Sequence, residues 1–211
     1  RKNVFPLVQN KATRMLLKMP VVNRKVKERI CAVVTDVFGG NAYEVMTGGA
    51  ALNKEIEDFL TSIGFPVTSG YGATETGPMI TYSDHKDFQR GSCGTPVINM
   101  EVKIASPDPA DIPGEILARG ENVMLGYYKN EEATKAVLDE EGWYHTGDLA
   151  TMSRDGHVFI RGRIKNMLLG ANGQNVYPEE IEDKLNSMTM VSESVVIQRG
   201  NELVGLVYPE M

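Results

Sequence analysis

The groups best suited to binding a phosphorylated ligand lie in residues 69–78, a run of small and polar residues with the sequence SGYGATETGP. It contains an aromatic ring (Tyr71), a hydroxyl (Thr74) and a carboxylate (Glu75), and the glycines around them add almost no bulk. The β-branched run before it, residues 66–68, predicts a short buried strand. Open α/β sheets bind ligands at such strand ends. We therefore expect a nucleotide site here, although a tight turn beside a core tyrosine would give the same pattern.

Two further motifs follow at residues 144–148 (YHTGD) and 162–165 (GRIK). With the first motif, and in this order, they resemble the adenylate-forming superfamily, which comprises acyl-CoA synthetases, aryl-CoA ligases, luciferases and nonribosomal peptide adenylation domains. The resemblance covers residues 44–185. It implies ATP and Mg²⁺ as cofactors, CoA as a co-substrate, and a carboxylic acid that is activated as an acyl-adenylate.

The resemblance assigns the catalytic groups of the first motif. Thr74 would donate its hydroxyl to the α-phosphate of ATP, and Glu75 would hold Mg²⁺. These roles suit the reaction, because a carboxylate is a poor nucleophile and must be held in line with a phosphate whose charge is neutralised. A single protein carboxylate also suits Mg²⁺, which keeps its waters and takes phosphate oxygens.

The adenine would lie between two glycine turns. The resemblance places the ring of Tyr71 on one face of the base and the backbone of Gly48, Gly49 and Ala50 along the other. A glycine at position 72 (Gly72) would let the ring approach the backbone closely.

Asp148 resembles the ribose clamp of the family, and one carboxylate can accept hydrogen bonds from both ribose hydroxyls. The alternative is an aspartate that caps a turn before a strand. His145, in the same motif, receives no role. The other histidines, His85 and His157, form no metal-ligand pattern with it or with the cysteines.

Arg163 resembles the family arginine that contacts the ribose or the phosphate, for which its permanent charge and donor fork are suited. Lys165 stands where the family has the hinge about which its small domain rotates. A basic turn that ends a strand is the alternative for both. Residues 169–174 are one position longer than the usual spacing, so no thiol-channel roles are assigned to them.

The composition is that of an ordinary globular protein: 211 residues, 42% hydrophobic and 24% charged. Two widely separated cysteines, Cys31 and Cys93, indicate a reducing compartment, and we expect a cytoplasmic location. Nine of the 22 basic residues lie within the first 29, although the net charge is −6. This basic segment could make weak peripheral contact with a membrane, or be the solvated face of a helix.

A stripe of aliphatic residues at helical spacing favours the solvated helix face over the membrane contact. Its members are Val22, Val26, Ile30, Val33, Val34 and Val37. The acidic remainder argues against nucleic-acid binding. Small-molecule substrates are the expected partners, and no protein partner is predicted.

The pattern of elements predicts an α/β fold followed by β structure. Residues 1–89 should end an α/β parallel-sheet subdomain, with a helix up to residues 39–41, strands at 42–47 and 66–68, and a helix capped by Asn53 between them. Residues 90–162 should form a small antiparallel barrel-like or curled sheet of hairpins. Residues 163–211 should start a small, mobile α+β C-terminal domain.

We expect a fragment of an AMP-forming acyl-CoA synthetase. The family's phosphate loop would lie upstream of Gly48 and its catalytic lysine beyond Met211, so this chain alone should not catalyse adenylation. A fatty acid is favoured as substrate because residues 175–182 resemble long-chain members. An amino-acid or aryl-acid adenylation domain is the nearest alternative, and a non-catalytic adenylate-binding module is another.

Overall fold

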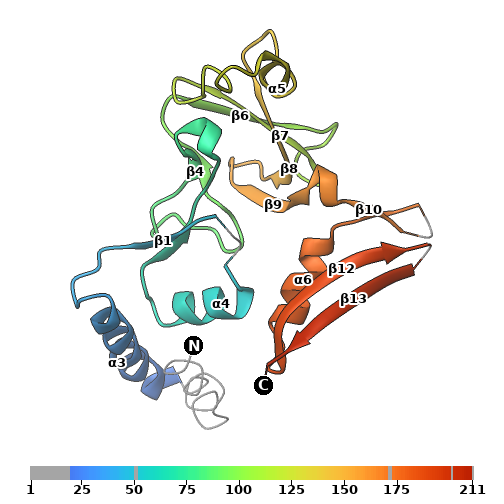
Figure 1. Cartoon of the computed structure of the whole chain (residues 1–211). Helices are drawn as coiled ribbons and strands as arrows, with labels where there is room; N and C mark the ends of the chain where they lie inside the picture. The colour runs from blue at the N-terminus through green and yellow to red at the C-terminus, as the bar shows by residue number, and fades with distance from the viewer. Residues whose placement is uncertain (1–19, 50–51, 171–172, 201, 211) are drawn as a thin grey trace.

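The structure is a computed structural model that describes residues 20–49, 52–170, 173–200 and 202–210. Three parts follow one another along the chain (Figure 1): an α/β part, a part made of antiparallel sheets, and a helix with a long hairpin. This order confirms the predicted fold class. The boundaries expected between the parts, after residues 89 and 162, stay predictions.

The α/β part is built on a parallel strand pair. Its elements are α3 (Pro20–Val37), β1 (Val45–Thr47), α4 (Lys54–Ser62) and β2 (Val67–Ser69). Strands β1 and β2 are parallel, with Val45 opposite Val67. As predicted, Asn53 caps α4, because its side chain accepts hydrogen bonds from the backbone of the first turn. Gly64 follows the helix with φ +76°, a conformation that favours glycine.

Helix α3 packs against this part along a narrow line. Its buried contact is Val34, flanked by the partly buried Ile30 and Cys31. The predicted stripe is wrong at Val33 and Val37, which are 59% and 73% exposed. These two residues extend the stripe beyond the line along which the helix meets the core. The first part of the predicted helix, residues 1–19, lies outside the described residues.

The second part contains two antiparallel sheets, of three and four strands. Their strands are β3 (Tyr71–Gly72), β4 (Met79–Tyr82), β5 (Thr95–Pro96), β6 (Met100–Ala105), β7 (Gly114–Gly120), β8 (Tyr144–Met152) and β9 (Val158–Arg163). The four-stranded sheet runs β6-β7-β8-β9, so β6 and β9 are its edges. Ile116 and Val158 are fully buried beneath it. The short helix α5 (Glu131–Lys135) joins β7 to β8, and the side chain of Asn130 caps it by accepting from the backbone N–H of Ala133.

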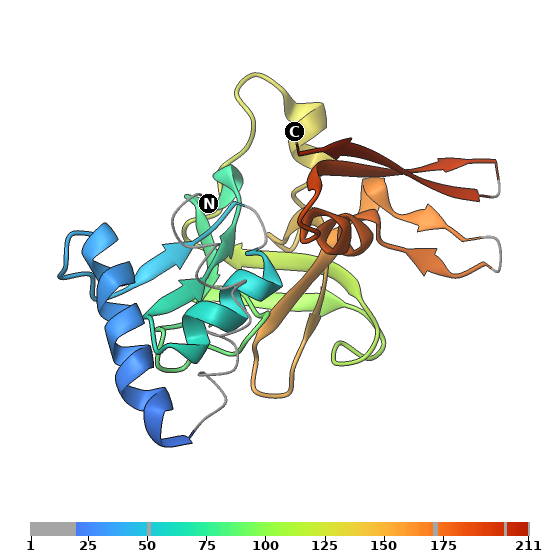
Figure 2. The same ribbon diagram turned by 90° about the horizontal axis from the view of Figure 1, so that it is seen from below.

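The third part has α6 (Pro178–Asn186), the hairpin of β12 (Val191–Arg199) and β13 (Glu202–Pro209), and the short pair β10 (Leu168–Leu169) and β11 (Asn175–Val176). Pro178 opens α6, where its missing N–H costs nothing. Both hairpins extend in the same direction, away from the rest of the chain (Figure 2). The side-chain amide of Gln198 donates to the carbonyl of Leu169 and joins them. No helix among the described residues is long and apolar enough to cross a membrane.

Candidate functional site

Three residues from separate motifs meet at one carboxylate. The Tyr71 hydroxyl donates to Asp148 Oδ2 at 2.6 Å, and Arg163 Nε donates to Asp148 Oδ1 at 2.7 Å. Tyr71 and Asp148 are 77 positions apart in the sequence, yet their side chains are in direct contact. The structure therefore brings together the three motifs that sequence analysis singled out.

Strand pairing explains how Asp148 and Arg163 meet. They are partners in the β8–β9 ladder, and the register shifts immediately beyond, between Leu149 and Ala150. Such an irregularity changes the direction in which nearby side chains point. The Asp148 backbone N–H donates to the Thr146 hydroxyl, which itself donates to the carbonyl of Ile116. The Asp148 backbone is thus anchored to the neighbouring strand β7.

The surroundings of this carboxylate are partly closed. The side chain of Asp148 is 13% exposed, whereas that of Arg163 is 63% exposed. Burial, followed by the hydrogen bond to Asp148, raises the pKa of Tyr71 well above its usual value. The hydrogen bond to Asp148 likewise raises the pKa of Arg163. Tyr71 is therefore a neutral donor and Arg163 a permanent cation.

Glu75 lies in the same neighbourhood. It sits in the 3-10 turn η1 (Thr74–Thr76), and its Oε1 accepts a hydrogen bond from the Tyr127 hydroxyl at 2.8 Å. The pKa of Tyr144 is raised, first by burial and then by the charge of Glu75, with a smaller contribution from Asp148. Because the charges of Glu75 and Asp148 both raise the pKa of Tyr144, the first and second motifs face a common region.

The two threonines of this turn differ in what they offer a ligand. Thr74 is exposed, and no hydrogen bond to its hydroxyl occurs within the described part of the chain. Thr76, by contrast, is fully buried, and its hydroxyl donates within the turn, to Ala73 or Pro78.

Gly72 is required by the turn itself. A Cβ at this position would lie 1.8 Å from the carbonyl oxygen of Pro78. No side chain fits there, because β3 and β4 meet across a register shift at Gly72 and Met79. The close approach that we expected is thus made by the protein backbone, and a contact with a base stays a prediction.

The second glycine turn lies beside the first, as expected for parallel strands. Gly48 and Gly49 follow β1, and the backbone N–H of Gly70 donates to the carbonyl of Thr47 at 2.9 Å. A Cβ on Gly48 would be 3.6 Å from the carbonyl oxygen of Gly70. Ala50, predicted to continue this surface, lies outside the described residues.

Lys165 is exposed in the 3-10 turn η2 (Ile164–Asn166), directly after β9. The adjoining Asn166 donates its side-chain amide to Glu179 Oε1 at 2.7 Å. Glu179 also faces Gly162, where a Cβ would lie 2.7 Å from its Oε2. The segment around Lys165 is thus the connection between β9 and α6.

Sequence reasoning missed the residues that hold the motifs in place. Asn122 donates its side-chain amide to the carbonyls of Thr76 and Met79, at 2.6 and 2.9 Å. The backbone N–H of Met124 donates to the Glu75 carbonyl at 2.7 Å. An Asn two residues after a strand-ending glycine is a turn signal, and it could have suggested such a contact.

Glu115 braces the second motif. Its Oε2 lies 3.0 Å from His145 Nδ1, and its Oε1 accepts from the Gly147 backbone N–H at 3.0 Å. Gly147 has φ +71° and immediately precedes Asp148. His145 is thus part of the support of this turn, which agrees with our assigning it no chemical role.

The arrangement suits a nucleotide and its metal ion. It offers a carboxylate for hydroxyl donors, an exposed guanidinium for negative charge, a free threonine hydroxyl, and a half-buried glutamate with one oxygen bonded to a tyrosine. Glu75 keeps acceptor capacity on Oε2. A single carboxylate oxygen is the kind of ligand that a hydrated Mg²⁺ takes from a protein. The residues present therefore fit both groups.

A family profile described as AMP-binding enzyme matches residues 6–128. The chain is 39% identical over 174 residues to 4-coumarate:CoA ligase 1 of Petunia hybrida, covering 76% of this chain and 32% of the relative. It is 34% identical over 188 residues to the long-chain-fatty-acid–CoA ligase FadD15 of Mycobacterium bovis, covering 89% and 30%. The chain thus spans about a third of the length of these curated relatives.

Among solved structures, the o-succinylbenzoate CoA synthetase of Bacillus subtilis, in complex with its acyl-adenylate intermediate, aligns with a TM-score of 0.72 and 27% identity. The alignment covers 86% of this chain and 40% of that one. Fold, motif geometry and family profile agree, and the profile covers more than half of the chain. The chain belongs to the AMP-binding enzyme family.

Proposed function

We propose that this chain forms the nucleotide-binding part of an ATP-dependent, AMP-forming acid–thiol ligase. Such an enzyme activates a carboxylic acid as an acyl-adenylate and transfers the acyl group to CoA. The observation that carries the proposal is the meeting of Tyr71, Asp148 and Arg163, with the turn of Thr74 and Glu75 facing the same region.

Asp148 binds the ribose in this proposal. Its two oxygens now accept from Tyr71 and Arg163, and ribose hydroxyls bring donors of the same kind. Exchanging one donor for another keeps the carboxylate satisfied, so ribose binding leaves no buried charge without a partner. The ring of Tyr71 would then lie on one face of the adenine, with Gly48, Gly49 and Ala50 along the other.

The phosphates lie beyond the ribose, next to η1. The free hydroxyl of Thr74 donates to the α-phosphate, and the exposed guanidinium of Arg163 attracts its charge. Glu75 would hold Mg²⁺, which neutralises phosphate charge when bound. The hydrogen bond from Tyr127 fixes the orientation of the Glu75 carboxylate.

The test of this site is pyrophosphate exchange into ATP, catalysed by the complete enzyme with a fatty acid. Glu75→Ala should abolish exchange because it removes the metal ligand. Glu75→Gln keeps an acceptor for Tyr127 but lacks the charge, and it should be nearly as inactive. Glu140→Ala removes an exposed acid elsewhere and is the matched control. Exchange at the wild-type rate in Glu75→Ala would exclude this role for Glu75.

A fatty acid is the acid that we propose as the substrate. The similarity to the long-chain relative extends over 188 residues, against 174 for the 4-coumarate ligase, although the identity is lower. Exchange assays with palmitate, 4-coumarate and a mixture of amino acids distinguish the candidates. A rate highest with 4-coumarate or with an amino acid would refute the fatty-acid assignment. No exchange with any acid would favour a non-catalytic adenylate-binding module.

Lys165 is the proposed hinge. The turn that contains it is exposed and connects β9 to α6, so a few backbone dihedrals could reorient the third part of the chain. Lys165→Pro should slow thioester formation from added acyl-adenylate and CoA while leaving pyrophosphate exchange intact. Equal loss of both half-reactions would argue against a hinge.

A cytoplasmic location also stays a prediction, which localisation of the tagged enzyme would check.

A further inference from the structure

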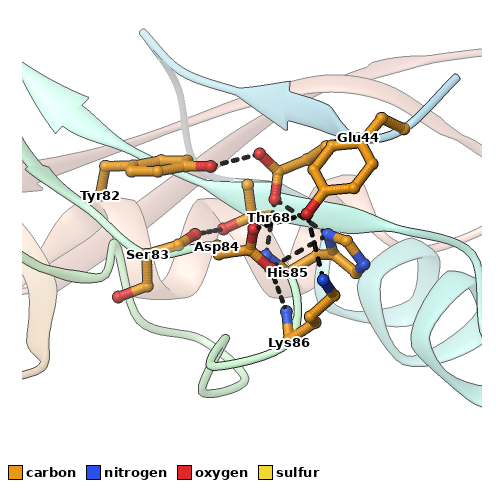
Figure 3. Close-up of polar contacts among 8 residues, drawn as sticks. Glu44, Thr68, Tyr82, Ser83, Asp84, His85 and Lys86 are labelled. Carbon is orange, nitrogen blue, oxygen red and sulfur yellow. Dashed lines mark hydrogen bonds and ion pairs between the residues drawn. The ribbon is translucent and has the colours of Figure 1, made fainter.

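A second polar cluster lies at the opposite end of β1 from the glycine turn. Glu44 immediately precedes β1, whereas Asp84 and His85 follow β4 (Figure 3). One ligand atom from each of the three lies within 4.8 Å of the other two. Two carboxylates and an imidazole are donors that divalent transition metals accept. Nothing in the nucleotide site uses these residues.

The distances within the cluster are long for hydrogen bonds. His85 Nδ1 lies 3.3 Å from Glu44 Oε1 and 3.3 Å from Asp84 Oδ1. Hydrogen bonds from nitrogen to oxygen usually span about 2.7–3.2 Å, and one ring nitrogen carries at most one proton. His85 Nδ1 therefore cannot donate a hydrogen bond to both acids. Two ligands of a tetrahedral Zn²⁺, each about 2.0–2.1 Å from the metal, are about 3.4 Å apart.

The three donors are partly buried and held in place by their neighbours. The side chains of Glu44, His85 and Asp84 are 14%, 21% and 34% exposed. Tyr82 donates its hydroxyl to Glu44 Oε2, and the backbone N–H of His85 donates to Glu44 Oε1 at 2.6 Å. Such outer contacts orient ligands before a metal binds.

Asp84 is held in the same way. Its Oδ1 accepts from the Lys86 backbone N–H at 2.9 Å, and its Oδ2 accepts from the Tyr43 hydroxyl at 3.2 Å. A carboxylate has about four acceptor positions, so these contacts leave room for a metal. The nearby positive charge, Lys86 Nζ, donates to the Tyr43 hydroxyl at 3.2 Å. The charge of Lys86 Nζ lowers the affinity of the cluster for a cation, but Nζ bonds to the Tyr43 hydroxyl and leaves the metal-ligand atoms free.

We propose that Glu44, Asp84 and His85 bind one divalent transition-metal ion of the Zn²⁺ class, with water completing the coordination. The imidazole favours such an ion over Mg²⁺, which prefers oxygen ligands. The bound ion connects the start of β1 to the end of β4. Its role is structural, since it stabilises the α/β part against the antiparallel part.

The experiment is a titration of the full chain with Zn²⁺ alone, followed by calorimetry, and with Co²⁺ alone, followed by visible absorption. We expect one saturable site, a visible Co²⁺ band, and a shift of the His85 ring resonances in the wild-type protein. Glu44→Gln and His85→Gln should each weaken Zn²⁺ binding by at least the factor of about 10–100 that loss of an outer contact alone causes. His157→Gln is the matched control, because within the described part of the chain His157 has one carboxylate partner, Asp155 at 3.1 Å.

Two results would overturn the proposal. One is the absence of saturable Zn²⁺ binding by the wild-type chain, a measurement that needs no variant to fold. The other is equal Zn²⁺ affinity in His85→Gln, His157→Gln and wild type. Neither result affects the nucleotide site, since Glu75 and Asp148 lie outside this cluster.

Discussion

Two polar clusters join distant segments of this chain, and they differ in the charge of the donors that their acids contact. Asp148 is one acid with two strong donors, Tyr71 and Arg163, at 2.6 and 2.7 Å. In the other cluster, two acids share one imidazole nitrogen at 3.3 Å from each. A carboxylate that already contacts a permanent cation can exchange its donors for a ligand that also brings donors, such as a sugar. Apart from this imidazole, the donors to these two acids are uncharged hydroxyl and backbone N–H groups, so the cluster favours a cation.

The largest expected effect tests the cluster of Asp148 with Tyr71 and Arg163. Asp148→Asn removes the charge that both Tyr71 and Arg163 contact, and it replaces one of the two acceptor oxygens with an amide that can only donate. Hydrogen bonds to charged groups contribute about 1.5–3 kcal/mol, so pyrophosphate exchange at low ATP should fall about 10–100-fold. Asp155→Asn alters an acid in the turn between the same two strands and should leave exchange unchanged. Similar rates for the two variants would remove Asp148 from the site.

The next effect compares one hydroxyl in each cluster. Tyr71→Phe should lower the free energy of unfolding by about 2 kcal/mol, because it leaves Asp148 Oδ2 without its donor in a largely buried position. Tyr82→Phe should cost less, because burial is the main cause of the raised pKa of Tyr71 but not of that of Tyr82, so water can more easily replace the Tyr82 hydroxyl. Urea unfolding of both variants measures the difference. A larger loss in Tyr82→Phe would contradict this ranking of the clusters.

The smallest effect concerns a third acid, which is buried in α4. Glu57 is 5% exposed and accepts from the Gly91 backbone N–H at 2.6 Å. Burial raises its pKa, so the folded state holds the proton more tightly than the unfolded state. Stability is therefore fully present below the ordinary glutamate pKa and is lost as the pH rises through the raised value.

Glu57→Gln removes this loss and keeps an acceptor for Gly91. It should raise the free energy of unfolding at pH 7 by about 1 kcal/mol, with the gain vanishing near pH 4. Glu55→Gln, at an exposed position of the same helix, should show no such pH dependence. A gain of equal size at both pH values would mean that burial of the charge is not the cause.

Local signals in the sequence predicted most of the elements. Asn53 caps α4, as predicted, through backbone chemistry that involves only neighbouring residues, and Asn130 and Pro178 start α5 and α6 by equally local means. Alternating residues around turn signals likewise predicted the hairpins of the second part. The exposure of Val33 and Val37 could not be predicted, because it depends on which side of α3 meets the core.

The site was predicted to the extent that its residues lie in recognisable motifs. Tyr71, Asp148 and Arg163 belong to three such motifs, and their meeting in space followed from the family resemblance. Asn122, Tyr127 and Glu115 support the motifs from other loops and strands, through contacts that no local pattern encodes. The cluster of Glu44 with Asp84 and His85 was missed for the same reason, because it depends on where β1 starts relative to the end of β4.

The most direct test of the nucleotide site is a crystal structure of the complete enzyme with bound AMP. We predict that the Asp148 carboxylate accepts the ribose hydroxyls at about 2.7 Å, with the Tyr71 ring against the adenine. AMP bound elsewhere, with the contacts of Asp148 to Tyr71 and Arg163 unchanged and no ribose beside them, would contradict the account.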